Sequence, residues 1–184
     1  MFTTSRLLAL AAGVAGCVAV GYADAGKYDL GTPISNAAAQ SAIDSWGPDG
    51  KDLPPGRGTY AEGKKLYGEK CVACHGAKLE GVPGAGDTLI GGRGSLVGGK
   101  PLKTIESYWP YATTVFDYVS RAMPFNAPGS LSASETYALT AYILSEAHII
   151  PESQVIDAKS LPKVEMPNRH GFISPDPRPD VRSN

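Results

Sequence analysis

Two cysteines and a histidine stand close together in the run Cys71-Val72-Ala73-Cys74-His75. Thiols three positions apart at the end of a helix lie near one face, where both can add to the two vinyl groups of one porphyrin. The adjacent imidazole then falls under the iron as a ligand. Gly76 allows the chain to turn away without a side chain that would strike the ring. This pattern predicts one covalently bound haem c.

Two other chemistries use closely spaced cysteines. A C-x-x-C redox pair usually opens a helix after a strand, whereas this pair ends an expected helix. A zinc knuckle needs four ligands, and the remaining histidines, His148 and His170, are distant in the sequence. A haem enzyme such as a peroxidase would need an open iron position with acid–base groups near it, and no such constellation is visible. We therefore favour a haem that transfers electrons.

The second axial ligand of the iron is expected to be a methionine. A thioether ligand raises the reduction potential and suits electron transfer. Met123 precedes Pro124 on a loop between two expected helices, from which it could reach across a haem edge. Met166 and His170 are the competitors, and a methionine can also simply fill a gap in a core. The sequence favours Met123, with His75, as the metal ligands.

Two further residues are candidates for haem contacts. Arg93, in a Gly-rich stretch, could pair with a haem propionate through its guanidinium fork, or could be a solvated loop side chain. Trp109 belongs to an aromatic group before Met123 that could wall the haem and exclude water, although such residues are more often plain core.

The elements that must hold these residues read as helices. Thr59 with Glu62 forms a capping box, which predicts a helix from Tyr60 to about Cys71. Ser132 with Glu135 forms a second, which opens a helix to about Ala147. Other expectations are a helix with Pro110 in its first turn that runs through Val119 and ends before Pro124, a Gly-rich loop over 79–103, and a short helix near 37–46. The expected fold class is all-α.

The chain divides into four regions. Residues 59–150 are expected to be the haem domain, between extended Pro-rich segments at 26–58 and 151–184. The C-terminal segment has too few apolar residues to fold alone, so it either wraps the domain or docks on a partner. The net charge of −1 carries no basic excess that would argue for nucleic acid.

Residues 1–25 read as a signal peptide. A positive start is followed by an apolar run and by Ala23-Asp24-Ala25, which resembles a cleavage site, and the run is too short to span a membrane. Residues 14–17 resemble a lipoprotein box ending in Cys17, so a lipid anchor is the alternative. We expect a soluble periplasmic protein without a transmembrane span.

The sequence resembles the class I cytochrome c family. In that family the first and last helices cross where a glycine and an aromatic residue meet a leucine and an aromatic residue, and Gly63, Tyr67, Leu139 and Tyr142 match this pattern. The family often has a Gly-Pro pair whose proline carbonyl accepts the N–H of the histidine ligand. Here the corresponding stretch is 86–89, Gly-Asp-Thr-Leu, which leaves the acceptor for His75 open.

A closer resemblance covers nearly all of the chain after the leader. It is to the cytochrome subunit of sulfane dehydrogenases, with much shared by sulfite dehydrogenase cytochromes. The resemblance implies a molybdopterin dehydrogenase partner that oxidises a sulfur compound, a downstream cytochrome or oxidase, and no catalytic residue in this chain. A free periplasmic shuttle is the alternative. The motifs are LPPG at 53–56, TYAEG at 59–63, KTIESYWPYA at 103–112, AMPFNAPGSL at 122–131 and LPKVEMPN at 161–168.

Overall fold

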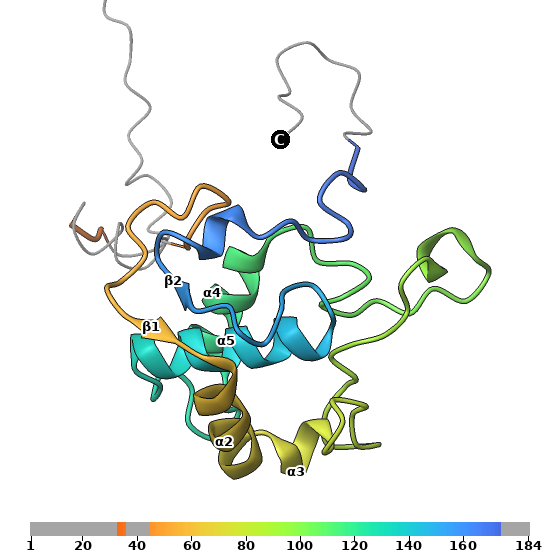
Figure 1. The fold of residues 1–184 in the computed structure, drawn as a ribbon, viewed down its shortest axis with the longest axis horizontal. Helices are drawn as coiled ribbons and strands as arrows, with labels where there is room; N and C mark the ends of the chain where they lie inside the picture. Colours follow the sequence, from red (N-terminus) through yellow and green to blue (C-terminus); the bar gives the residue numbers. More distant parts are fainter. Residues whose placement is uncertain (1–32, 36–44, 174–184) are drawn as a thin grey trace, which may run out of the picture. The chain divides into compact units, whose positions relative to one another are not determined.

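The computed structural model describes residues 33–35 and 45–173 (Figure 1). The chain divides into two units, 1–43 and 44–184, and almost all of the described residues belong to the second. The expected signal peptide, Cys17 and most of the helix expected near 37–46 lie outside the described residues. Within the described part of the chain, no helix is long and apolar enough to cross a membrane.

Helices form the centre of the second unit. They are α2 (Tyr60–Lys70), the short α3 (Val72–His75), α4 (Ala112–Ala122) and α5 (Ala133–Glu146). Both predicted capping boxes are present at the starts of α2 and α5. The middle helix ends before Pro124 as predicted, but the expected start is wrong. Tyr111 is the extended N-cap of α4, so Pro110 precedes the helix instead of lying in its first turn.

Helices α2 and α5 cross closely. A side chain at Gly63 would collide with the backbone of Ala138 and with Tyr142, so only glycine allows this approach. The rings of Tyr67 and Tyr142 pack at 5.0 Å between centroids beside the crossing, and Leu139 is buried next to it. This arrangement confirms the class I cytochrome c pattern expected from the sequence.

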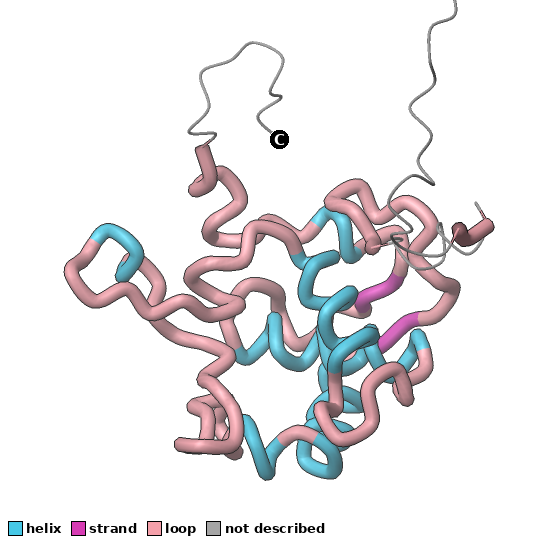
Figure 2. The backbone as a smooth tube through the Cα atoms, turned by 180° about the vertical axis from the view of Figure 1, so that it is seen from behind, coloured by secondary structure: helices cyan, strands magenta, loops and turns pink. Residues whose placement is uncertain are grey.

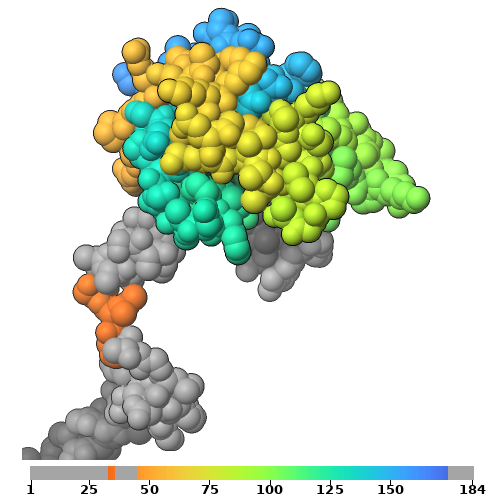
Figure 3. All heavy atoms as spheres, turned by 90° about the horizontal axis from the view of Figure 1, so that it is seen from below, coloured from red at the N-terminus to blue at the C-terminus, as the bar shows by residue number. Residues whose placement is uncertain are grey.

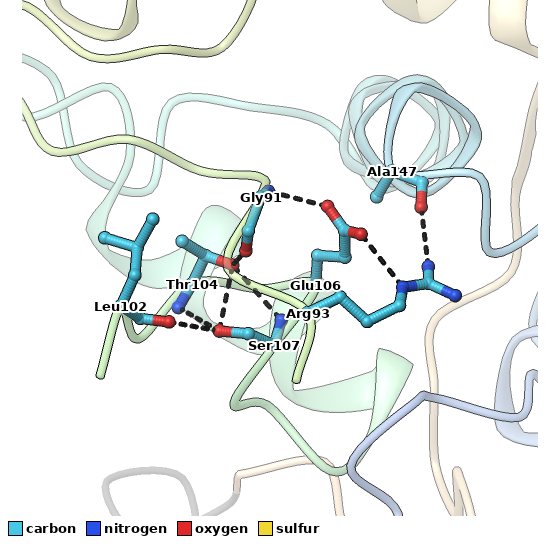
Figure 4. A network of polar contacts seen from close by, with 7 residues as sticks. All are labelled: Gly91, Arg93, Leu102, Thr104, Glu106, Ser107 and Ala147. Carbon is cyan, nitrogen blue, oxygen red and sulfur yellow. Dashed lines mark hydrogen bonds and ion pairs between the residues drawn. The ribbon is translucent and has the colours of Figure 1, made fainter. Parts of the chain in front are cut away.

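Irregular backbone makes up most of the region between α3 and α4 (Figure 2). It contains an isolated bridge between Val82 and Gly86 and a 3₁₀ helix over Ser95–Val97. Thr104 and Ser107 bond to each other and to backbone carbonyls of this region, and Glu106 joins it to the end of α5 through Arg93 (Figure 4). The predicted Gly-rich loop is therefore present, and polar bonds within it give it a definite path.

The segments on either side of the haem domain meet in a small sheet. Strand β1 (Arg57–Gly58) pairs antiparallel with β2 (Ile156–Asp157), and β1 lies against α5. Beyond β2, a 3₁₀ helix over Leu161–Lys163 contacts α4. Apolar side chains of this segment are buried in the common core: Ile156, Leu161, Val164 and Met166. Of the two alternatives for the C-terminal segment, the described residues therefore show wrapping around the domain.

Candidate haem site

The two cysteines lie one helical turn apart. Cys71 caps the end of α2 and the start of α3, and its carbonyl accepts the N–H of Cys74 at 3.1 Å and of His75 at 2.9 Å. Both cysteines are free thiols; Cys71 is half-buried and Cys74 is exposed. Burial raises the pKa of the Cys71 thiol to about 11, so it is protonated at neutral pH. The turn therefore presents two free thiols within reach of one flat ligand.

The ring of His75 is fixed by a backbone carbonyl. Its Nδ1 lies 2.9 Å from the carbonyl oxygen of Asp87. A carbonyl can only accept, so Nδ1 carries the proton and Nε2 keeps its lone pair free for a metal. Asp87 thus supplies the acceptor that the sequence left open. The sequence could not have revealed this acceptor, because Asp87 accepts the bond with its main-chain carbonyl oxygen and not with its side chain.

The loop after the motif returns close to it. The N–H of Gly81 donates to the carbonyl of His75 at 2.8 Å, and Leu89 N–H donates to the carbonyl of Leu79 at 2.9 Å. Gly86 passes so near α3 that a Cβ there would lie 2.7 Å from the carbonyl oxygen of Cys74. Glycine at this position lets two backbones approach and brings Asp87 to His75.

The candidate sixth ligands differ in their surroundings. Met123 is the extended C-cap of α4 and packs half-buried against the core. Met166 is only 3 % exposed, whereas His170 lies on the surface. Protein atoms therefore already surround the Met166 thioether, while that of Met123 is partly open. Ligation by Met123 stays a prediction, and this difference favours it.

Arg93 has protein partners on two of its nitrogens. Its Nε donates to Oε1 of Glu106 at 2.9 Å, and its Nη2 donates to the carbonyl of Ala147 at 3.0 Å (Figure 4). The other oxygen of Glu106 accepts the N–H of Gly91 at 2.6 Å. The idea of a simply solvated loop arginine is therefore wrong, and a propionate contact by the remaining nitrogen stays a prediction. Sequence reasoning missed Glu106, although it is the only acidic residue between Asp87 and Asp117.

Trp109 lies half-buried before α4. Its ring packs edge-on to Tyr118 at 5.7 Å and against the core cluster. The predicted contact between Trp109 and haem stays a prediction.

The residues present fit a covalent haem. Two free thiols and an imidazole with an available Nε2 lie on one short helix and its N-cap. Partly buried apolar side chains pack against the core and remain available to contact a flat apolar ligand: Val72, Leu89, Ile90, Trp109 and Met123. Figure 3 shows the surface formed by the motif segment (yellow), the following loop (yellow-green to green) and the segment after α4 (blue-green). When bound, haem supplies one-electron Fe(III)/Fe(II) chemistry. Within the described residues, no three His, Cys, Asp or Glu side chains form a metal cluster of the kind a zinc site requires.

Comparison with known proteins agrees with this geometry. The cytochrome c family model matches residues 60–147. The crystal structure of the sulfane dehydrogenase SoxCD from Paracoccus pantotrophus matches with a TM-score of 0.70 and 41% identity, covering 83% of this chain and 74% of that chain. The chain belongs to the class I c-type cytochrome family, whose members carry covalent haem c and transfer electrons.

Curated relatives match over shorter stretches. The cytochrome bc1 complex cytochrome c subunit of Mycobacterium tuberculosis is 59% identical over 29 residues, which are 16% of this chain and 10% of that protein. Cytochrome c-551 of Bacillus subtilis is 49% identical over 35 residues, 19% of this chain and 31% of that protein. This chain therefore spans less than a third of the length of either relative, so these matches say nothing about a whole-protein activity.

Proposed function

We propose that this protein is the electron-transfer subunit of a sulfur-oxidising dehydrogenase. It accepts electrons from a molybdopterin-containing sulfane or sulfite dehydrogenase and passes them to a downstream cytochrome or oxidase. The observation that carries the proposal is the extent of the likeness to SoxCD. The family model stops at residues 60–147, whereas the structural match covers 83% of the chain and therefore continues into the segments outside the haem domain.

A generic electron shuttle does not need these flanking segments. A shuttle requires a haem domain with an accessible edge. In this chain, residues 45–58 and 155–168 add a second layer on α4 and α5, pinned by the β1–β2 pair and by the bond from Asn168 Nδ2 to the carbonyl of Tyr108 at 2.7 Å. Because the match to SoxCD extends into these ordered segments, they support the proposal of a dehydrogenase subunit over that of a generic shuttle.

In this proposal, the residues of this chain only bind and orient the haem. Cys71 and Cys74 anchor the haem, His75 and Met123 bind its iron, and Asp87 orients His75 through the bond at 2.9 Å. No residue needs to bind or activate a sulfur substrate, so the proposed protein is not itself an enzyme. The protein is proposed to act in the periplasm after removal of residues 1–25, with lipidation of Cys17 as the alternative. The intact mass of protein from its native host distinguishes the two.

The decisive experiment is anaerobic reduction. The purified cytochrome alone should stay oxidised when mixed with sulfite, thiosulfate or a persulfide. Adding a molybdopterin-containing sulfane or sulfite dehydrogenase from the same organism should reduce the haem rapidly, whereas the same partner prepared without molybdenum should not. If the intact partner neither binds nor reduces the cytochrome, the protein is instead a free periplasmic electron carrier.

A further inference from the structure

A buried tyrosine hydroxyl is bonded to the residue that follows the histidine of the motif. Tyr67, on α2, is 2 % exposed, and its hydroxyl donates to the carbonyl of Gly76 at 2.8 Å. Burial raises the pKa of Tyr67, so the hydroxyl stays protonated and remains a donor. The aromatic ring alone would suffice for the helix crossing with Tyr142. The hydroxyl is therefore an addition whose partner is the residue directly after the haem motif.

From Gly76 a short route leads back to the ring of His75. The carbonyl of Gly76 also receives a long bond, 3.4 Å, from the N–H of Leu79, whose side chain is fully buried. The carbonyl of Leu79 accepts from Thr88 Oγ1 at 3.1 Å and from the N–H of Leu89 at 2.9 Å. These bonds fix the backbone immediately after Asp87, whose own carbonyl accepts the His75 Nδ1–H.

We propose that Tyr67 is a positioning residue for the haem ligand His75: its hydroxyl holds the turn at Gly76–Leu79 and, through Thr88, keeps the Asp87 carbonyl on the imidazole Nδ1–H. A firm bond at Nδ1 makes Nε2 more basic, and a more basic ligand favours Fe(III) over Fe(II). The hydroxyl of Tyr67 thereby lowers the reduction potential. This inference rests on His75 being the iron ligand and does not depend on any partner.

The chain offers a closely matched set of variants. Tyr67→Phe removes one hydroxyl and keeps the ring. Tyr137→Phe is the control, because Tyr137 is also fully buried and its hydroxyl also donates to a carbonyl, that of Pro54 at 2.9 Å, away from the motif. Thr88→Val weakens the same route closer to Asp87, because it removes the hydroxyl that bonds the carbonyls of Leu79 and Ile90, each at 3.1 Å, and leaves the Leu89 N–H bond in place. None of these changes alters a formal charge, and Tyr137→Phe controls for the loss of a buried tyrosine hydroxyl as such.

The experiment measures the midpoint potential of each holoprotein, with hydrogen exchange of the His75 Nδ1–H by NMR as a second readout. Tyr67→Phe and Thr88→Val should each shift the potential to more positive values and speed the exchange, while Tyr137→Phe should change neither. A tenfold change in the one-electron equilibrium corresponds to about 59 mV. The double variant should shift less than the sum of the two singles, because both act on one route.

Two results would overturn the proposal. One is a potential for Tyr67→Phe equal to that of Tyr137→Phe, which would make the hydroxyl a structural bond only. The other applies if Tyr67→Phe does not assemble with haem: an unchanged potential in Thr88→Val then refutes the route. Because the measurement uses the cytochrome alone, either result would leave the proposed dehydrogenase partner standing.

Discussion

At His75, the group that orients the ring is the main chain of Asp87. The Asp87 side chain is exposed, and its carboxylate makes no hydrogen bond or ion pair within the described part of the chain. We therefore expect Asp87→Ala to keep the low-spin haem spectrum and to change the free energy of unfolding by less than about 0.5 kcal/mol. Visible spectroscopy and denaturant unfolding of the holoprotein test this expectation. A high-spin spectrum would show that the carboxylate contributes to the site.

The two methionines separate ligation from packing. Met123→Ala should abolish the sulfur-to-iron absorption band of the ferric protein and lower the potential, because the thioether ligand is lost. Met166→Ala should keep the band but lower the free energy of unfolding by about 2–5 kcal/mol, since Met166 is 3 % exposed in the core. The opposite pattern would transfer the ligand role to Met166.

Features formed by residues close together in the sequence could be predicted, whereas features that depend on contacts across the loop could not. Cys71, Cys74 and His75 lie within one turn, so their spacing alone indicates the chemistry. Asp87 and Tyr67 contribute through contacts across 12 and 9 positions that depend on the path of the loop. A backbone carbonyl carries no sequence signal, and the tyrosine was expected only as an aromatic at the helix crossing.

Among the elements, the start of α5 shows how much a local motif determines. The Ser132 N–H and hydroxyl both donate to Glu135 at 2.8 Å, and the Glu135 N–H donates to Ser132 Oγ at 3.3 Å. We expect Ser132→Ala to lower the free energy of unfolding by about 1 kcal/mol at pH 7. Ser134→Ala, at an exposed position two residues along, should change it much less.

The same capping box predicts a pH dependence. The bonds from the Ser132 backbone and hydroxyl lower the pKa of Glu135 below its ordinary value of 4.5. Because Glu135 binds a proton more readily in the unfolded chain, its ionised carboxylate stabilises the folded state. This stabilisation is present above pH 4.5 and is lost as the pH falls through the folded-state pKa. The difference between wild type and Ser132→Ala should shrink over that range in urea titrations. A difference that does not change with pH would contradict a role for the bond between the Ser132 hydroxyl and the Glu135 carboxylate.

Other elements could not be predicted from local pattern. The strands β1 and β2 are two residues each and pair Arg57 with Asp157 and Gly58 with Ile156, across about half of the chain. Strands of two residues are too short to show an alternation of apolar and polar residues in the sequence. They are explained instead by the packing of Gly58 on α5 and of Ile156 in the core. Similarly, Pro110 is compatible with a first helical turn, but the extended N-cap at Tyr111 delays α4 to Ala112.

At the scale of the whole molecule, residues 45–58 and 151–173, the parts of the flanking segments that the structure describes continuously with the haem domain, belong to its fold. On the N-terminal side, Trp46 packs edge-on to Phe116 at 5.1 Å, and its Nε1 donates to the carbonyl of Asp52 at 3.0 Å. On the C-terminal side, Tyr108 packs against Phe172 at 5.1 Å. A low count of apolar residues in 151–184 therefore did not mean that the segment lacks a packed position, because a few apolar side chains enter a core that other elements supply.

The packing of the segment that contains β2 indicates that this segment is ordered by its own domain and does not need a partner to become ordered. Ile156 is fully buried and Val155, its neighbour, is 41 % exposed. We expect Ile156→Ala to lower the free energy of unfolding of the isolated holoprotein by about 2–5 kcal/mol, because it leaves a cavity between β2 and α5. Val155→Ala removes a similar side chain from the surface and should cost less than about 0.5 kcal/mol. Denaturant unfolding without any partner measures both, and equal small effects would mean that this segment becomes ordered only in the complex.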